Sequence, residues 1–135
     1  GTNARLGSGD YVVVEADESD GTFVCLSPTV EIITNIDPEH LDQHGSVEAL
    51  EHAFLQFVNR IPFYGFAVVC QDHPAVQRLV AKVRRSRIVT YGFARQAEYR
   101  AGKLTTDGMK TKFSVFHNDK ELGAITLGMP GRHNV

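Results

Sequence analysis

Two segments of this 135-residue chain place metal-binding side chains directly after apolar, β-branched runs. In the first, Tyr11–Val14 is followed by Glu15 and then by a polar cluster of Asp17, Glu18, Ser19 and Asp20. In the second, the run that ends at Ile36 is followed by His40. Because ligands of open α/β sheets bind beyond the carboxyl ends of the strands, we expect these side chains to meet at one crevice. Carboxylates there could hold Mg²⁺ together with substrate phosphates.

Each of these residues also has a simpler interpretation. The carboxylates from Glu15 to Asp20 repel one another, and either a divalent cation or a solvated turn relieves that repulsion. A lone histidine such as His40 is more often a structural hydrogen-bonding residue than a metal ligand. Its i, i+4 spacing to His44 is that of a helical zinc pair, but Pro38 and Gly45 bracket the two and leave little room for a helix, so zinc is disfavoured.

The last residues of the sequence offer a second kind of chemistry. Gly-Arg-His-Asn, at 131–134, follows Pro130. The carboxamide of Asn134 has a donor and an acceptor that match those of adenine, so this segment could bind a purine, or it could be an ordinary loop that leaves the last strand. The GxxxxGK[ST] phosphate loop, the GxGxxG motif and the nucleophile elbow are absent from the 135 residues.

The hydrophobic pattern predicts a mostly parallel α/β sheet flanked by helices. Short apolar runs that suit buried strands occupy 11–15, 29–36, 66–70 and 87–91. Ser46 is a candidate N-cap for a helix that runs to about Ile61, and Asp72 is a candidate N-cap for a second helix with Pro74 in its first turn. The resulting alternation of strands and helices is typical of a parallel sheet.

The pattern changes after about residue 97. Three strand-like runs at 99–105, 109–116 and 121–127 are separated by Asp107-Gly108 and by the residues 117–120. Asp-Gly between alternating runs is a strong hairpin signal. We therefore expect a parallel α/β part over 1–97 and a small antiparallel subsheet over 98–130.

Composition narrows the class of protein. The chain has 14 basic and 16 acidic residues and no basic stripe, which argues against nucleic-acid binding. Its apolar runs fall short of the roughly 20 residues that span a bilayer, and the start has no signal-peptide pattern. Two cysteines without CxxC spacing favour free thiols in a reducing compartment. The expected protein is soluble and cytoplasmic.

Four motifs, taken in order along the chain, resemble the central ATP-binding domain of the Mur ligases. They are Glu-Ala-Asp-Glu-Ser-Asp at 15–20, Thr-Asn-Ile-x-x-x-His-x-Asp at 34–42, Ile-Pro-Phe-Tyr-Gly at 61–65 and Gly-Arg-His-Asn at 131–134. The resemblance extends over essentially the whole chain. The wording of the first and third motifs favours the alanine-adding member of the family over the member that recycles a preformed tripeptide.

The resemblance implies a mechanism and a set of residue roles. ATP would phosphorylate the carboxylate of UDP-N-acetylmuramate, and the amine of L-alanine would attack the acyl phosphate and release phosphate. Glu15 and His40 resemble the two protein ligands of the Mg²⁺ ion, and His133 and Asn134 resemble the adenine contacts. Asp17, Glu18, Ser19 and Asp20 would line the same pocket.

The resemblance also implies that other domains and motifs needed for the reaction lie outside these residues. The phosphate loop, the uridine-binding domain and the amino-acid-binding domain of the family have no counterpart in these residues, so we expect a bacterial, partial ATPase domain that folds but does not turn over. An exposed sheet edge would then favour a dimer. A folate-adding cousin, the tripeptide-recycling ligase and a non-catalytic nucleotide-binding or assembly module remain alternatives.

Overall fold

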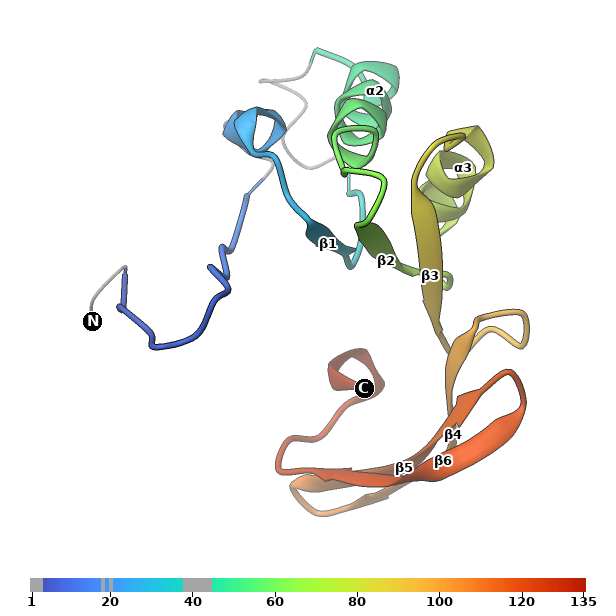
Figure 1. Ribbon diagram of the computed structural model, residues 1–135. Coiled ribbons are helices and arrows are strands. Elements are labelled where there is room, and N and C mark those ends of the chain that lie inside the picture. Colours follow the sequence, from blue (N-terminus) through green and yellow to red (C-terminus); the bar gives the residue numbers. More distant parts are fainter. Residues whose placement is uncertain (1–3, 18, 20, 38–44) are drawn as a thin grey trace.

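The computed structural model describes residues 4–17, 19, 21–37 and 45–135. Their strands form one six-stranded sheet in the order β1-β2-β3-β4-β5-β6, so that neighbours in sequence are neighbours in space. The elements, in chain order, are η1 (Thr22–Cys25), β1 (Val30–Ile33), α2 (Val47–Val58), β2 (Phe66–Cys70), α3 (Pro74–Lys82), β3 (Arg87–Gly92), β4 (Tyr99–Asp107), β5 (Lys110–His117), β6 (Lys120–Leu127) and η3 (Arg132–Asn134). Figure 1 shows η1, α2 and α3 together at one end of the molecule and β4, β5 and β6 at the other.

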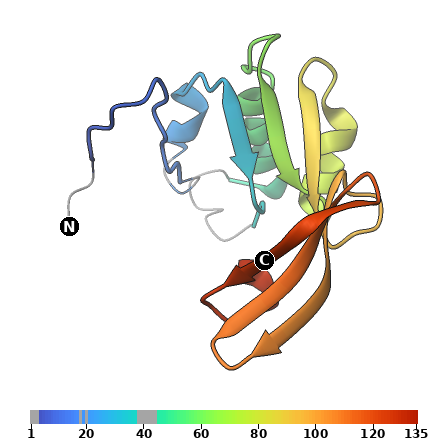
Figure 2. The ribbon, with the colours of Figure 1, turned by 60° about the horizontal axis from the view of Figure 1, so that its bottom comes forward.

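The first part of the sheet is parallel, as its sequence pattern predicts. β1 pairs with β2 and β2 with β3 in parallel register, with Val30 opposite Phe66 and Phe66 opposite Arg87. In Figure 2, α2 and α3 both lie behind these strands, so a single face of the parallel part carries the helices. The opposite face of β1 is exposed at Val30 and Ile32.

The second part of the sheet is antiparallel, which confirms the predicted change of pattern. β5 pairs with β4 and with β6 in antiparallel register. Of the two tight turns, the second holds Asn118 and Asp119 at φ 47° and 65°, a left-handed pair typical of a two-residue hairpin. The first turn falls at Gly108 and Met109 and not at the expected Asp107-Gly108, because Asp107 still pairs with Lys110.

The two parts meet at a narrow junction. β3 and β4 are parallel and pair at two positions, Tyr91 opposite Tyr99 and Gly92 opposite Arg100. By contrast, β2 and β3 pair at five positions from Phe66 to Cys70. Few ladder hydrogen bonds therefore fix the orientation of the antiparallel strands relative to the parallel ones.

Helix α2 follows directly from its sequence. Ser46 caps it, as predicted, because its hydroxyl oxygen accepts the main-chain N–H of Ala49 at 3.1 Å. The apolar residues at helical spacing face the sheet, and the Phe54 and Phe57 rings lie 4.9 and 5.3 Å from the ring of Phe23 in η1. These aromatic contacts anchor η1 to the core. The described core residues are Phe23, Ile33, Ile36, Leu50, Phe54, Phe57, Val58, Ile61, Ala67, Val69, Ala75, Val76 and Leu79.

Two further sequence-based expectations are wrong. Residues 11–15 form no strand, and Tyr11, Val12 and Val13 are exposed. An apolar run becomes a strand only where a neighbouring edge pairs with it and other side chains cover it, and the segment has neither here. The expected strand 29–36 is confirmed in a shorter form, Val30–Ile33.

The second wrong expectation concerns the start of α3. Its N-cap is His73, which makes no side-chain capping bond, although Pro74 does occupy the first turn. Asp72 instead turns its carboxylate toward the end of β3, where it accepts two main-chain N–H groups. Within the described part of the chain, no helix has the length and apolar character to cross a bilayer.

Candidate functional site

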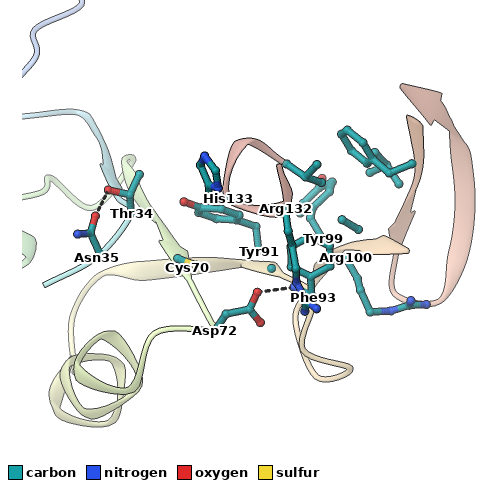
Figure 3. Close-up of a pocket in the computed structure, with 15 residues that line it drawn as sticks. Thr34, Asn35, Cys70, Asp72, Tyr91, Phe93, Tyr99, Arg100, Arg132 and His133 are labelled. Atoms are coloured by element: carbon teal, nitrogen blue, oxygen red, sulfur yellow. Dashed lines mark hydrogen bonds between the residues drawn. The ribbon is translucent and has the colours of Figure 1, made fainter. Parts of the chain in front are cut away.

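A pocket of about 840 Å³ lies where the carboxyl ends of the parallel strands meet the antiparallel strands (Figure 3). Thr34 and Asn35 follow β1, Cys70 ends β2 and Asp72 follows it, and Tyr91 is the last residue but one of β3. The remaining wall comes from the end of β3 and the turn after it, from β4 and β5, and from the last residues of the chain: Gly92, Phe93, Tyr99, Arg100, Ala101, Phe113, Val115, Arg132, His133 and Val135. This is the position at which α/β sheets bind ligands.

A chain of polar contacts holds the β1 rim of the pocket. The Thr34 hydroxyl donates to the Asn35 carboxamide oxygen at 2.7 Å, and the Asn35 amide donates to Asp37. Asp37 in turn pairs with the Nε2 atom of His73 at 3.2 Å, just before α3 begins. Both ends of the Asn35 carboxamide are thus engaged, which fixes its orientation at the pocket wall.

The Asp72 carboxylate holds the turn that follows β3. Its two oxygens accept the main-chain N–H groups of Phe93 and Ala94, each at 2.7 Å. Gly92 makes this approach possible: its φ is 149°, and a Cβ there would lie 2.8 Å from the carboxylate carbon of Asp72. The carboxylate therefore ties the end of β2 to the start of the antiparallel part.

Tyr91 supplies a neutral hydrogen-bonding group in the pocket. Its pKa is raised above the ordinary value of 10.0, first by burial and then by its contact with Cys70 and the negative charge of Asp72. The phenol therefore keeps its proton at neutral pH and can donate to an acidic ligand.

The predicted adenine contacts lie in a compact turn beside this pocket. His133 lines the pocket, with its Cε1 atom 2.6 Å from where a Cβ of Gly131 would lie. The Asn134 amide donates to the Pro130 carbonyl at 2.7 Å, which uses one amide hydrogen and leaves the carboxamide oxygen and the other hydrogen for a ligand. The guanidinium of Arg132, the residue before His133, lies 4.0 Å from the centre of the Phe93 ring.

The structure tests the predicted metal and acidic residues only in part. Glu15 is exposed and follows no strand, contrary to the expectation that it ends one. The Oδ1 atom of Asp17 accepts the main-chain N–H of Ser19 at 2.8 Å, which forms a local turn. Glu18, Asp20 and His40 lie outside the described residues, so the expected approach of Glu15 to His40 stays a prediction. Among the described residues, no three His, Cys, Asp or Glu side chains gather as a metal site would require.

Three polar residues at or next to the pocket were not predicted from the sequence as site residues: Asp72 lines the pocket, and Asp37 and His73 lie behind Asn35. Asp37 and His73 meet across 36 positions, and Asp72 reaches Phe93 across 21. The Nδ1 atom of His73 is buried and has no hydrogen-bond partner among the residues that the structure describes. The sequence feature that could have indicated Asp37 and Asp72 is their position, because both follow a buried strand, as Glu15 was expected to do.

Comparison with known proteins gives consistent results. The model of the Mur ligase middle domain matches residues 3–135. The UDP-N-acetylmuramate–L-alanine ligases of Anaeromyxobacter dehalogenans (strain 2CP-C) and Sorangium cellulosum (strain So ce56) are each 52% identical to this chain, over 134 and 135 residues. These alignments cover 99% and 100% of the chain, and the chain spans 29% of the length of these curated relatives.

The solved structures show the same fold. The crystal structure of the UDP-N-acetylmuramate–alanine ligase MurC from Thermotoga maritima matches with a TM-score of 0.72 at 26% identity, over 87% of this chain and 25% of that one. The UDP-N-acetylmuramate:L-alanyl-γ-D-glutamyl-meso-diaminopimelate ligase from Neisseria meningitidis matches with a TM-score of 0.70 at 23% identity, over 83% and 33%. The second likeness is evidence for the fold alone.

Proposed function

The chain belongs to the family of Mur ligase middle domains, and we propose that it supplies the nucleotide-binding part of an ATP-dependent ligase of bacterial peptidoglycan synthesis. The observation that carries the proposal is the 52% identity, over essentially the whole chain, to relatives named UDP-N-acetylmuramate–L-alanine ligase. The pocket at the carboxyl ends of the parallel strands gives the proposed nucleotide a place to bind. In this proposal, 1–97 is the parallel part of the domain and 98–130 its antiparallel subsheet.

The proposed reaction of the full-length protein joins L-alanine to the carboxylate of UDP-N-acetylmuramate. ATP phosphorylates that carboxylate, the alanine amine attacks the acyl carbon, and phosphate leaves from the tetrahedral intermediate. Orientation of the two substrates and stabilisation of developing charge account for most phosphoryl-transfer catalysis. The neutral Tyr91 phenol and the oriented Asn35 amide are polar groups of this chain that can orient a ligand in the pocket.

The metal ligands that we propose are Glu15 and His40. The Glu15 carboxylate fits a hard cation chemically, because it is exposed and makes no hydrogen bond or ion pair within the described residues. Mg²⁺ needs few protein ligands when substrate phosphates complete its shell. When bound, the ion would neutralise charge on the transferred phosphoryl group.

The nucleotide contacts that we propose are His133 and Asn134. The position of His133 in the pocket wall and the unused donor and acceptor of the Asn134 carboxamide support this assignment. The acidic segment is proposed to line the same region through Asp17, Glu18, Ser19 and Asp20. Within this segment, the hydrogen bond from the Ser19 main-chain N–H to Asp17 Oδ1 supports a fixed orientation of the Asp17 carboxylate.

Phosphate release by the full-length protein tests the proposal. With ATP and UDP-N-acetylmuramate, release should require L-alanine and should not be supported by the preformed tripeptide or by folate with glutamate. Release with the tripeptide alone would assign the protein to the recycling ligases instead. Absence of release with every acceptor, in a folded protein that binds ATP, would leave a non-catalytic nucleotide-binding module.

Substitution of the proposed metal ligands gives the first testable prediction. Glu15→Ala and His40→Ala should each lower kcat by about 100-fold or more, because loss of a metal clamp removes several kcal/mol of charge stabilisation. Asp10→Ala, an exposed carboxylate on the same segment, should retain the parental rate. The metal assignment fails if Glu15→Ala and Asp10→Ala have equal rates in the phosphate-release assay.

Two further parts of the proposal concern location and assembly. Cys25 and Cys70 are free thiols in the structure, which supports a reducing compartment such as the bacterial cytoplasm. Within the described strands, the outer edge of β1 is unpaired and Ile32 is 67% exposed, which supports pairing of two chains along that edge. Sedimentation of the parental chain and of Ile32→Lys should show a dimer that the lysine abolishes.

A further inference from the structure

The junction between β3 and β4 holds an interaction that the proposed reaction does not use. The Asp72 carboxylate accepts hydrogen bonds from the main-chain N–H groups of Phe93 and Ala94, each at 2.7 Å. Asp72 lies between β2 and α3, whereas Phe93 and Ala94 lie 21 and 22 residues later, between β3 and β4. Hydrogen bonds from two N–H groups to an ionised carboxylate are stronger than bonds between neutral groups. Figure 3 shows the Asp72 carboxylate turned toward Phe93, with one of these bonds drawn.

Asp72 has no role as a helix cap that would explain this geometry. The N-cap of α3 is His73, and no side chain caps that helix. The absence of a side chain at Gly92 allows the contact, because a Cβ there would lie 2.8 to 2.9 Å from the three carboxylate atoms of Asp72. Side chain and backbone thus fit one another at this point.

The Gly92–Ala94 turn, which Asp72 holds, contacts Arg132 near the last described residues. Phe93 follows Gly92, and the guanidinium of Arg132 lies 4.0 Å from its ring centre. This geometry is favourable because the face of an aromatic ring attracts a cation. The two residues after Arg132 are those proposed to bind adenine.

The segment that Arg132 begins is a compact unit. The main-chain N–H of Asn134 donates to the Gly131 carbonyl at 3.2 Å, and that of Val135 donates to the Arg132 carbonyl at 3.2 Å. Through these bonds, a displacement of Arg132 displaces His133 and Asn134 as well. Because β3 and β4 pair at only two positions, the strand ladder alone fixes the Gly92–Ala94 turn weakly, and the Asp72 carboxylate adds to it.

We propose that Asp72 is a positioning residue for the nucleotide site. It holds the Gly92–Ala94 turn, and the contact of Phe93 with Arg132 transmits this restraint to His133 and Asn134. The inference rests on the proposed function, since it assumes that residues 131–134 bind the nucleotide. It adds a restraint that reaches this segment from the end of β2 through the Gly92–Ala94 turn.

A double-mutant cycle in the full-length ligase tests this link, with Mg·ADP binding measured by calorimetry. Asp72→Asn keeps the shape of the side chain but turns an amide donor toward one of the two N–H groups. Arg132→Gln removes the cation over Phe93. Each variant should weaken Mg·ADP binding about tenfold, and the double variant should bind as weakly as the weaker single one, because both substitutions break the same link.

Three controls make the result interpretable. KM for UDP-N-acetylmuramate should stay within about twofold in Asp72→Asn, whereas general loss of structure would change it as well. Asp107→Asn removes an exposed carboxylate at the far end of β4 and should bind Mg·ADP like the parent. Asn134→Ala should itself weaken binding; if it does not, the proposed function fails at this segment.

Other outcomes would overturn the positioning role alone. The positioning role would be refuted if Asp72→Asn bound Mg·ADP with parental affinity while Asn134→Ala bound it more weakly. It would also be refuted if the loss of affinity in the double variant equalled the product of the two single losses, since Arg132 and Asp72 would then act independently. If Asp72→Asn does not fold, Arg132→Lys keeps the charge and loses the planar stacking group, and parental affinity in that variant would refute the link.

Discussion

The His133 ring lies against the main chain of Gly131 so closely that a methyl group has no room. A Cβ at Gly131 would lie 2.6 Å from the Cε1 atom of His133, and the φ of Gly131 is 108°. L-residues rarely adopt that backbone conformation, so a side chain here adds strain as well as a clash. The position of the proposed adenine contact thus depends on a residue without a side chain.

Gly131→Ala should therefore weaken nucleotide binding. In the full-length ligase we expect Mg·ADP to bind about tenfold more weakly, because the imidazole must leave the pocket wall to admit the methyl group. Gly128→Ala is the matched control, since nothing lies within 4 Å of the methyl position there. Calorimetric titration of both variants checks the prediction, and equal affinities for the two would show that the Gly131–His133 packing is irrelevant to the nucleotide.

At the scale of the elements, α2 and α3 are joined by a shared carboxylate. Glu51 of α2 accepts from the Arg78 Nε and the Lys82 Nζ atoms of α3, each at 2.8 Å. Its side chain is 10% exposed, whereas those of Arg78 and Lys82 are 54% and 53% exposed. The hydrogen bonds from Lys82 and then Arg78 lower the pKa of Glu51 below its ordinary value of 4.5.

Glu51→Gln should destabilise the fold by about 1–2 kcal/mol, a discounted figure because both cations reach into solvent. Since the folded-state pKa is lowered, the contribution is complete above pH 4.5 and is lost as the pH falls toward the folded value. Urea unfolding should accordingly show a gap between parent and variant at neutral pH that closes in acid. Glu48→Gln, exposed in the first turn of the same helix, should change stability by only a few tenths of a kcal/mol. A gap for Glu51→Gln that is the same at both pH values would contradict this account.

The elements that the sequence predicted well are those with local signals. Ser46 as a cap, the helical spacing of Leu50, Phe54 and Phe57, and the uniformly apolar run at 66–70 each act within a few residues, and the structure has α2 and β2 there. The segment 11–15 carries the same kind of apolar run, yet forms no strand. Pairing is a property of the neighbouring edge and cannot be deduced from the run itself.

Less of the site than of the fold could be predicted, because its contacts depend on how strands pair and not on local sequence patterns. His133 lines the pocket, and its role as an adenine contact stays a prediction. Asp72 was expected to cap α3, because an Asp before Pro74 has the local pattern of a cap. Its actual partners, Phe93 and Ala94, come into reach only through the parallel pairing of β2 with β3, which no local pattern encodes.

At the scale of the whole molecule, one buried carboxyl opposes folding at neutral pH. Glu31 is 4% exposed on the helix-covered face of β1, and among the described residues neither of its carboxyl oxygens has a hydrogen-bond partner. Burial raises its pKa from 4.5 to about 8. The folded chain therefore keeps a proton on Glu31 over a pH range in which the unfolded chain has lost it.

This protonation difference sets the sign of the pH dependence. Between pH 4.5 and about 8 the folded state binds more protons than the unfolded state, so the free energy of unfolding falls as the pH rises. The slope approaches about 1.4 kcal/mol per pH unit and the total is several kcal/mol. Glu51 acts in the opposite sense below pH 4.5, so these two glutamates together place the greatest stability near that value.

Glu31→Leu should remove most of this slope and raise the free energy of unfolding at pH 8 by a few kcal/mol, because an apolar side chain of similar size needs no proton to be buried. Urea unfolding of parent and variant across this pH range measures both quantities. Glu48→Gln is the control that removes an exposed glutamate and should leave the slope unchanged. A parent whose stability does not decline between pH 5 and 8, or a Leu variant that declines equally, would show that Glu31 reaches solvent or a cation in the folded molecule. In that case β1 would carry a paired or hydrated charge and not a buried neutral acid.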